Sequence, residues 1–271
     1  MTQISFIGGG NMASALIEGL LNNTATKEDI HVVDIYPPTR LHLTQQFGIH
    51  TDETLNDRLR TSDVIILAIK PQQMKTLATE LAPYLGHQLI ISIAAGIRLH
   101  DLSRWLNNYP NLIRTMPNTP ALIKEGVTGL IAMPQVSAQN CQLAERILQS
   151  VGHTIWVNQE SDIDHITAIS GSGPAYVFYL IEALQEAAEQ LGFSAADAKF
   201  LALQTFKGAS QLALHSPESP HTLRERVTSK GGTTHAAITH METHQLKDLF
   251  IDAVKAAAHR AQTLGEELGE S

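Results

Sequence analysis

The hydrophobic pattern of the first 160 residues alternates between short continuous apolar runs and segments with helical periodicity. The run at 4–8 ends at glycines, and in residues 11–21 the apolar positions recur with the period of a helix. Continuous apolar runs are typical of parallel strands that are buried on both faces of a sheet. The spacing predicts further strands of βαβ units at 30–35, 64–70, 89–95 and 112–116.

The pattern changes near residue 160. Before this point, a strand at 127–133, a helix at 138–152 and a strand at 154–157 complete an α/β domain. After it, alanine-rich helical stretches dominate, at 174–192, 195–215 and 246–268. The sequence therefore predicts an α/β fold class, with an N-terminal Rossmann-like dinucleotide-binding domain (1–160) and an all-α C-terminal domain (161–271).

Composition and charge narrow the class of protein. The formal net charge is −8 and no run of Lys or Arg occurs, which argues against nucleic-acid and anionic-membrane partners. Cys141 is the single cysteine, so we interpret it as a small apolar residue and expect a reducing compartment. The first ten residues lack a signal-peptide pattern, and the apolar run at 64–69 is too short to span a bilayer. We expect a cytoplasmic protein.

The first glycine-rich loop favours a dinucleotide. Gly8, Gly10 and Ala13 follow a strand and open a helix with G-x-G-x-x-A spacing. In this setting Gly8 permits a tight turn, Gly10 lets a pyrophosphate approach the backbone, and Ala13 lets helix and strand pack closely. The free N–H groups of the helix N-terminus then offer positive potential to the phosphates. A tight turn without a ligand is the alternative.

Residues after the next strands are candidates for the other coenzyme contacts. Asp34 ends the second strand, where a carboxylate accepts from a ribose 2′-hydroxyl and disfavours the 2′-phosphate of NADP. Arg40 is near enough to turn toward such a phosphate or to be a solvated surface residue, and Tyr36 could flank the adenine. The choice between NADH and NADPH stays open. Three further candidates, Ala68, Lys70 and Pro71, lie at the carboxyl end of another strand. Of these, Lys70 is either a phosphate contact or a solvated lysine.

A second glycine pair lies near the other end of the chain. In "SKGGTT" (229–234), Gly231 and Gly232 precede an apolar helical pattern. The N–H groups at such a helix start could hold a carboxylate, although a simple N-cap without a ligand has the same sequence. "SGSGPAY" (170–176) similarly interrupts a helical run, either because the backbone approaches a ligand or partner closely or because it separates two helices.

These segments together resemble the pyrroline-5-carboxylate reductase family. "FIGGGNMA", "AIKPQ", "RTMPNTPA" (114–121), "SGSGPAY" and "VTSKGGTTHAAI" stand in the family's order and spacing over nearly the whole chain. The resemblance implies NADPH- or NADH-dependent reduction of L-1-pyrroline-5-carboxylate to L-proline, the last step of proline synthesis. Two positions depart from the family pattern. Lys230 replaces a common proline, and Asp34 stands where many members carry a small polar residue followed by arginine.

The resemblance also assigns roles to residues. It implies that the Thr234 hydroxyl faces the imine nitrogen and that Ser229, Gly231, Gly232 and Thr233 hold the substrate carboxylate. It implies a helical domain that binds substrate and forms a homodimer, sometimes within a larger ring of dimers. The expected coenzyme-binding residues are Gly8, Gly9, Gly10, Asn11, Met12, Asp34, Tyr36, Arg40, Ala68, Lys70 and Pro71.

Three other functions are less well supported. A β-hydroxyacid dehydrogenase needs a lysine as acid and base, but the candidates Lys199 and Lys207 lack the asparagine that would support it. A regulator that senses NAD(P) without turnover would leave the second loop without a purpose. His235, His240 and His244 lie close together in the sequence and could suggest a metal site. This function is disfavoured because His240 and His244 do not form an H-E-x-x-H motif and because hydride transfer to an imine needs no metal. No metal is expected.

Overall fold

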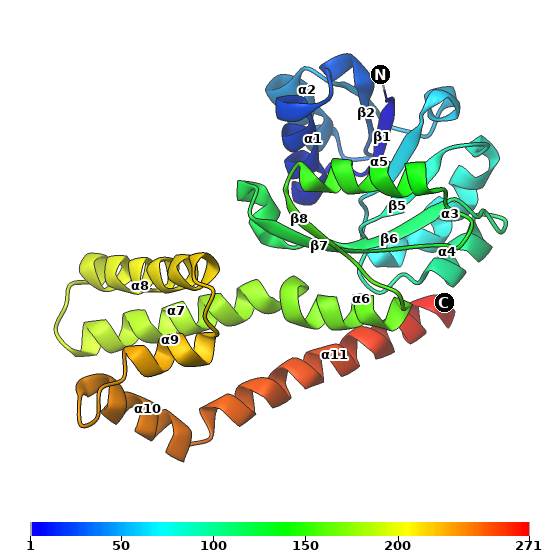
Figure 1. The fold of residues 1–271 in the computed structure, drawn as a ribbon. Coiled ribbons are helices and arrows are strands. Elements are labelled where there is room, and N and C mark those ends of the chain that lie inside the picture. The colour runs from blue at the N-terminus through cyan, green and yellow to red at the C-terminus, as the bar shows by residue number, and fades with distance from the viewer. Residues whose placement is uncertain (1, 271) are drawn as a thin grey trace. The chain divides into compact units, whose positions relative to one another are not determined.

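The computed structural model describes residues 2–270, which contain an eight-stranded sheet and the helices shown in Figure 1. The strand order is β3-β2-β1-β4-β5-β6-β7-β8, and all neighbouring pairs are parallel except β6 and β7, which are antiparallel. The strands are β1 (Ile4–Ile7), β2 (Ile30–Val33), β3 (His50–Asp52), β4 (Val64–Leu67), β5 (Leu89–Ser92), β6 (Leu112–Met116), β7 (Gly126–Ala132) and β8 (Gly152–Trp156).

Helices cover both faces of this sheet (Figure 1). One face packs against α1 (Asn11–Asn23), α2 (Pro37–Phe47) and α5 (Ala138–Gln149). The other packs against α3 (Met74–Leu81), α4 (Leu99–Trp105) and α6 (Glu160–Ile166). Short turns of helix connect these elements: η1 (Lys27–Asp29), η2 (Asp57–Thr61), η3 (Pro71–Gln73), η4 (Ala82–Tyr84), η5 (Thr119–Ile123) and the π-helix η6 (Thr167–Gly171). The predicted α/β class with a Rossmann-like N-terminal part is confirmed.

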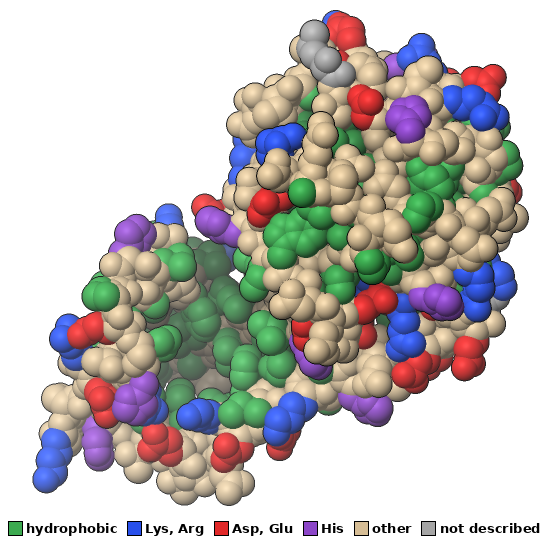
Figure 2. Space-filling view, turned by 45° about the vertical axis from the view of Figure 1, so that its right-hand side comes forward, with side chains coloured by type: hydrophobic (Ala, Val, Ile, Leu, Met, Phe, Trp, Pro, Cys, Tyr) green, Lys and Arg blue, Asp and Glu red, His purple; other side chains and the backbone are tan. Residues whose placement is uncertain are grey.

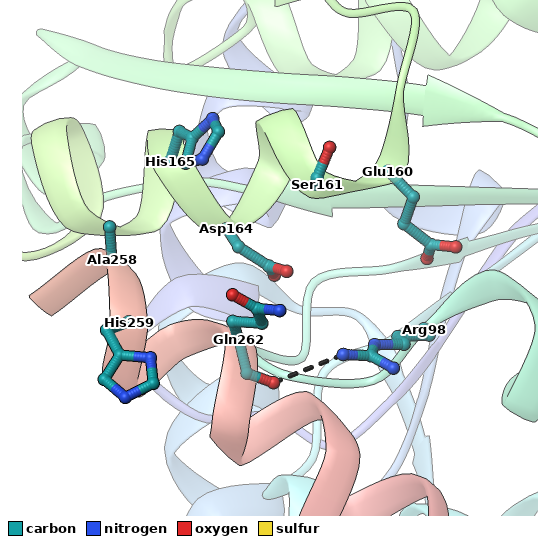
Figure 3. Close-up of a pocket in the computed structure, with 8 residues that line it drawn as sticks. All are labelled: Arg98, Glu160, Ser161, Asp164, His165, Ala258, His259 and Gln262. Atoms are coloured by element: carbon teal, nitrogen blue, oxygen red, sulfur yellow. Dashed lines mark hydrogen bonds between the residues drawn. The ribbon is translucent and has the colours of Figure 1, made fainter.

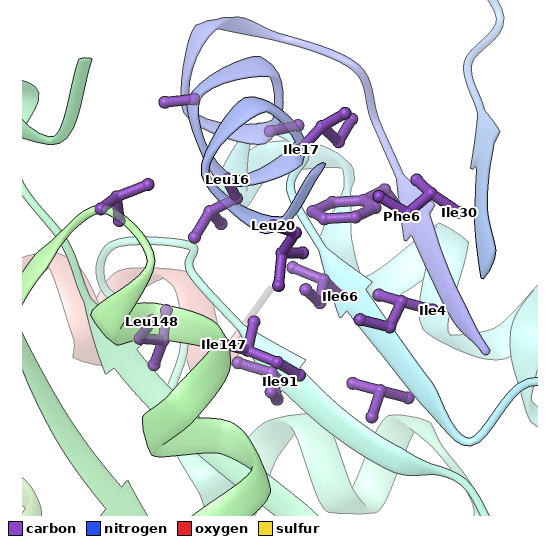
Figure 4. Close-up of a cluster of buried hydrophobic side chains, with 14 of the residues drawn as sticks. Ile4, Phe6, Leu16, Ile17, Leu20, Ile30, Ile66, Ile91, Ile147 and Leu148 are labelled. Carbon is purple, nitrogen blue, oxygen red and sulfur yellow. The ribbon is translucent and has the colours of Figure 1, made fainter. Parts of the chain in front are cut away.

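The two faces of the sheet have separate cores because successive strand residues point to opposite faces. Within β4, for example, Ile66 belongs to the first core and Ile65 to the second, and both are fully buried. Figure 4 shows the first core, in which Phe6 and Ile91 from the strands meet Leu16 from α1. Burial on both faces is why these strands are continuous apolar runs in the sequence.

The remaining helices are α7 (Gly173–Gln190), α8 (Ala195–His215), α9 (Pro220–Arg226), α10 (Thr233–Thr243) and α11 (Leu246–Glu270). Among residues 2–270, no helix combines the length and apolar composition that crossing a bilayer requires. By its internal contacts the chain divides into Met1–Ser172 with Ala257–Ser271, here called the sheet unit, and Gly173–Ala256, the helical unit.

This division differs from the predicted domains of 1–160 and 161–271. Residues 161–172 join the sheet unit because Ile163 packs in its second core. The end of α11 joins it as well, because Leu264 and Leu268 lie against Gly96. The backbone oxygens of Gln262 and Gly269 accept hydrogen bonds from Arg98 and Arg104. The assignment of functions to 1–160 and 161–271 stays a prediction.

Candidate functional site

The first glycine loop connects β1 to α1 with close backbone packing. Gly8 has φ +97°, and a Cβ added to it would lie 2.5 Å from the backbone oxygen of Ala68. Its N–H donates to the Val33 carbonyl at 2.8 Å, and the Ala68 N–H donates to the Ile7 carbonyl at 2.8 Å. The loop is thereby fixed against the ends of β2 and β4. The structure thus brings Gly8 and Ala68 together, as a strand-end coenzyme site requires.

Gly10 forms the open part of the same loop. It is the N-cap of α1, and no atom lies within 4 Å of the position that a Cβ would occupy. The Ser14 N–H makes the first helical hydrogen bond, to the Gly10 carbonyl, so the N–H groups of Asn11, Met12 and Ala13 precede the helical ladder. Within the described residues, no side chain caps this helix and its first turn has no acidic residue. The loop therefore fits a pyrophosphate.

Asp34 holds the loop in place. Its Oδ2 accepts from the Gly9 N–H at 2.7 Å, and its Oδ1 accepts from the Tyr36 N–H at 2.7 Å. Gly9 is needed here for space, because a Cβ would lie 2.6 Å from Leu43 Cδ1 and 2.8 Å from Thr39 Cγ2. Each carboxylate oxygen retains a further lone pair, so Asp34 can accept from a ribose hydroxyl while it orders the loop.

Tyr36 and Arg40 have different surroundings. Tyr36 lines a cavity of about 450 Å³ beside Gly9, Gly10 and Asn11, where it is 62% exposed. Arg40 is bound on both sides, with Nη1 donating to the Asp34 carbonyl at 2.7 Å and Nη2 to Glu53 Oε2 at 3.0 Å. Tyr36 therefore lies on the wall of the cavity beside the loop, and its contact with the adenine stays a prediction. Arg40 instead contacts protein groups and is mostly buried.

The predicted residues at the end of β4 lie beside the loop to different degrees. Ala68 contacts it directly, as described above, and Lys70 and Pro71 follow at the start of η3. Lys70 is exposed and is the N-cap of that short turn. Lys70 is therefore open to solvent at the carboxyl end of β4, and its role as a phosphate contact stays a prediction.

The second glycine loop, in the helical unit, is a tight turn that leads into α10. The Gly232 N–H donates to the Ser229 carbonyl at 3.0 Å, and Gly231 has φ +76° with open space around it. A turn with positive φ at its third residue is the type II turn, which requires glycine there. Gly232 is tighter, because a Cβ would lie 2.6 Å from Ser229 Oγ. The turn therefore requires glycine at position 231, and the packing against Ser229 favours glycine at position 232.

The start of α10 offers free backbone donors and two hydroxyls. Gly232 is its N-cap, and the Ala236 N–H makes the first helical bond, to the Gly232 carbonyl at 3.1 Å. The N–H groups of Thr233 and Thr234 therefore precede the ladder. Within the described part of the helix, no side chain caps it and no acidic residue occupies its first turn. Thr233 is exposed and Thr234 is half-buried, one residue further along.

The motif at 114–121 contacts the first two residues of the break at 170–176, and these contacts lie within the sheet unit. The Asn118 side chain donates to the Ser170 carbonyl at 3.0 Å and accepts from the Val127 N–H at 2.8 Å. A Cβ on Gly171 would lie 2.7 Å from Met116 Cε. Ser170 and Gly171 lie in the π-helix, an element that frequently marks functional sites. The glycine break thus allows close approach of Met116.

A second cavity of the sheet unit, of about 470 Å³, is lined by α6 and α11 (Figure 3). Glu160 Oε1 accepts from Arg114 Nη1 at 3.1 Å, and Asp164 Oδ1 accepts from Arg114 Nη2 at 2.6 Å. Arg114 is almost fully buried, so the paired carboxylates compensate its charge and fix α6 on the sheet. None of the residues predicted to bind coenzyme or substrate lines this cavity.

Sequence reasoning missed several residues near the nucleotide loop. Thr39 and Leu43 of α2 enclose Gly9, and His42 lines the same cavity as Tyr36. α2 gives no clear periodic signal because Leu43 is its one buried residue among those described. Cys141 agrees with its interpretation as an apolar residue, because burial raises the pKa of its thiol and so disfavours the reactive thiolate.

Comparison with known proteins gives the family. Residues 160–264 match the family described as pyrroline-5-carboxylate reductase dimerisation, and residues 3–96 match NADP oxidoreductase coenzyme F420-dependent. A pyrroline-5-carboxylate reductase of Pseudomonas aeruginosa is 44% identical over 269 residues, covering 99% of this chain and 98% of the relative. The chain belongs to the pyrroline-5-carboxylate reductase family.

Solved structures of the same family have a similar fold. The pyrroline-5-carboxylate reductase of Coxiella burnetii superposes with a TM-score of 0.90 at 42% identity, covering 97% of this chain and 98% of that one. The Plasmodium falciparum pyrroline carboxylate reductase, determined with NADP bound, gives a TM-score of 0.87 at 30% identity and the same coverage. The expected reaction is confirmed. The protein is an NAD(P)-dependent oxidoreductase that reduces L-1-pyrroline-5-carboxylate to L-proline in proline biosynthesis.

Proposed function

We propose that the loop at 229–233 binds the substrate carboxylate and that the Thr234 hydroxyl hydrogen-bonds the imine nitrogen. The observation that carries this proposal is the N-terminus of α10. Its first N–H groups lie outside the helical ladder, and the described residues place neither a capping side chain nor an acid there. Ser229, Gly231, Gly232 and Thr233 form the turn that presents these donors. A carboxylate is the ligand that such a helix start favours.

The reaction requires these residues to hold the pyrroline ring and its nitrogen in place during hydride transfer. When bound, a reduced nicotinamide would supply a hydride to C5 of the pyrroline ring. If the ring nitrogen is protonated beforehand, the electrons of the C5=N π bond become the nitrogen lone pair of proline. The Thr234 hydroxyl hydrogen-bonds this nitrogen while its charge changes. The backbone donors of the loop fix the ring through its carboxylate, so little reorganisation is needed during the chemical step.

The coenzyme binds, in this proposal, at the loop between β1 and α1. Gly8, Gly9 and Gly10 with Asn11 and Met12 hold the pyrophosphate, and Ala68, Lys70 and Pro71 line the same edge of the sheet. We infer that NADH is a usable reductant, because the Asp34 carboxylate disfavours a 2′-phosphate. Arg40 supports the same preference, because its guanidinium is already bound to the Asp34 carbonyl and to Glu53.

The family match to a dimerisation region supports a homo-oligomer, and we propose a homodimer formed by the helical unit. Figure 2 shows hydrophobic side chains gathered over this unit. In the described parts of α7, α9 and α10 no residue is buried, whereas Phe178 is 64% exposed and Phe200 is 62% exposed. An apolar surface of this kind is costly in water and marks an interface. Light scattering should give at least twice the mass of one chain. Larger rings of dimers are a further arrangement to test by the same measurement.

The setting follows from the chemistry. We propose that the protein acts in the cytoplasm, where NAD(P)H is available and a single free cysteine stays reduced. Its proposed partners are the small-molecule substrate and further copies of itself, without nucleic acid or membrane.

The experiment that tests the site is a steady-state assay of Thr234→Ala with L-1-pyrroline-5-carboxylate and each coenzyme. Loss of one hydrogen bond that strengthens in the transition state should lower kcat roughly 100-fold. Coenzyme affinity, measured by fluorescence titration, should stay unchanged because the contact proposed for Thr234 is with the substrate and not with the coenzyme. Thr243→Ala is the matched control, because Thr243 lies at the other end of α10, where its hydroxyl bonds the Thr239 carbonyl. Equal loss of coenzyme affinity and turnover in Thr234→Ala would contradict the assigned role.

A further inference from the structure

Three potential metal ligands to which the coenzyme and substrate sites assign no role meet at the edge of the sheet. His31 of β2 pairs in register with His50 of β3, and Asp52 follows two residues later on the same face of β3. His31 Nε2 lies 2.9 Å and His50 Nε2 lies 3.2 Å from Asp52 Oδ2. One ligand atom from each residue lies within 4.8 Å of the others. His31 is mostly buried, whereas His50 is half exposed, so the group opens to solvent on one side.

The spacing of these atoms is close to that of a zinc site. Zn²⁺ binds imidazole nitrogen and carboxylate oxygen at about 2.0–2.2 Å in tetrahedral sites. Two ligand atoms of such a tetrahedron are therefore about 3.3 Å apart. The two nitrogen-to-oxygen distances, 2.9 and 3.2 Å, need to change by only a few tenths of an ångström to reach this value.

The hydrogen-bond partners of His31 Nδ1 are compatible with either tautomer of the ring. Its Nδ1 lies 3.0 Å from Ser5 Oγ, which in turn lies 2.7 Å from Ser62 Oγ. The Ser62 hydroxyl can donate to the Arg58 carbonyl at 3.3 Å. With a metal on Nε2, the Nδ1 proton is donated to Ser5, Ser5 donates to Ser62, and Ser62 donates to Arg58. Without a metal, Ser5 donates to Nδ1. A second-sphere acceptor for the other ring nitrogen is what metal-bound histidines require.

Two further features bear on the affinity. His31 is mostly buried and its Nε2 already faces Asp52 Oδ2, so this ring nitrogen is held toward the position of the ion. Asn56 Nδ2 donates to Asp52 Oδ2 at 2.7 Å and fixes the carboxylate. Against these, the positive charge of Arg58 acts on His31 and opposes a cation.

We propose that His31, His50 and Asp52 bind a divalent transition-metal ion of the zinc type, with solvent as the fourth ligand. Two imidazoles and one carboxylate are the ligand set of open, four-coordinate zinc sites. The ion would join β2 to the edge strand β3. The Asp52 carbonyl accepts the Asp34 N–H at 3.0 Å, so the ion would also steady the residue that orders the nucleotide loop.

The test is a titration of the untagged, chelator-treated full-length protein with Co²⁺, followed by its visible absorption. A tetrahedral site of this composition should give an absorption band that saturates at one equivalent, and Zn²⁺ should remove the band by competition. His50→Ala should weaken Co²⁺ binding at least tenfold. The matched control is the double variant His240→Ala with His244→Ala, because their ring centroids are 4.3 Å apart and they are the competing histidine pair at the C-terminal end of α10. This control should bind Co²⁺ like the parent chain.

Thermal unfolding supplies the second readout. Zn²⁺ at saturating concentration should raise the Tm of the parent chain and of the α10 control, because a ligand that binds the native state stabilises it. It should raise the Tm of His50→Ala and of Asp52→Asn less than that of the parent chain, and Asp52→Asn tests the site through another ligand if His50→Ala is unstable. Absence of saturable Co²⁺ binding, or equal binding and equal Tm shifts in all variants, would overturn the proposal and leave the cluster as a hydrogen-bonded strand edge.

Discussion

The two glycine loops have similar sequences but are built for different reasons. In the loop after β1, Gly8 and Gly9 lie against Ala68, Leu43 and Thr39, where a Cβ would collide. In the loop before α10, Gly231 has open space around it and is required only by its φ of +76°. Gly8 and Gly9 of the first loop thus pack against neighbouring elements, whereas the close contact of Gly232 in the second loop is with Ser229 of the same turn. Coenzyme binding is therefore coupled to folding, whereas the proposed carboxylate site can be altered without loss of the fold.

The largest effect should come from Gly8→Ala. It combines a strained left-handed φ with a collision against the Ala68 backbone, and the sum should cost about 3 kcal/mol of stability. The Tm should fall by roughly 10 °C and coenzyme binding should be lost. Differential scanning calorimetry and fluorescence titration with NADH measure the two effects.

Gly10→Ala separates packing from ligand binding in the same loop. Gly10 has φ −67° and its Cβ would enter open space, so the variant should keep the parent Tm. The added methyl group should nevertheless obstruct the pyrophosphate and weaken coenzyme binding. If both variants lose stability equally, the loop is not divided into a packed and an open part as described.

A smaller effect is expected for Gly231→Ala in the second loop. Strain at φ +76° should cost about 1–2 kcal/mol, with no collision to add to it. The turn should shift its N–H groups, so kcat/KM for L-1-pyrroline-5-carboxylate should fall roughly tenfold while KM for the coenzyme stays constant. Gly208→Ala in α8 is the control, because its Cβ also enters open space and alanine should stabilise that helix by about 0.5–1 kcal/mol. An equal rise of both KM values in Gly231→Ala would count against the separation of the two loops.

The difference between the loops also explains what the sequence could predict. The Rossmann-like order, the loop after β1 and the helix start at Thr233 could be predicted because apolar runs and glycine spacing record backbone constraints directly. The pairing of β7 with β6 in antiparallel orientation could not, because a buried antiparallel strand has the same apolar composition. β3 was missed because its His50, Thr51 and Asp52 are polar and partly exposed.

Side-chain partners were hardest to predict. Asp34 was expected to face a ribose, and the structure adds that both carboxylate oxygens accept backbone N–H groups. Arg40 was weighed as a phosphate contact or a solvated residue, and its bond to Glu53 links it to a segment that no local pattern connects with it. The cluster of His31, His50 and Asp52 depends on strand register, which the sequence does not show.

Asp34→Asn tests how the first loop sets coenzyme preference. Removing the negative charge should raise kcat/KM with NADPH relative to NADH by about tenfold, which corresponds to about 1.4 kcal/mol. One amide group replaces a carboxylate oxygen, so one of the hydrogen bonds from Gly9 or Tyr36 is also lost and the Tm should fall slightly. Asp57→Asn is the control for net charge, because Asp57 is exposed and pairs with Arg60. A parallel change in both coenzymes would mean that Asp34 orders the loop without selecting the coenzyme.

The smallest effect is expected at Lys230. Two substitutions at this position distinguish the effect of backbone stiffness from the effect of charge in the second loop. Lys230 is the second residue of the turn from Ser229 to Gly232, a position at which proline is favoured. Lys230→Pro should therefore raise stability by about 0.4–1 kcal/mol by restricting the unfolded chain. It also removes an exposed positive charge next to the proposed carboxylate site, so KM for the imino acid should rise about twofold at low ionic strength. Lys230→Gln removes the charge without restricting the backbone, and it should raise KM equally while leaving the Tm unchanged. If KM rises in Lys230→Pro alone, turn geometry rather than charge controls binding, and the carboxylate is held by the backbone donors of α10 without help from this lysine.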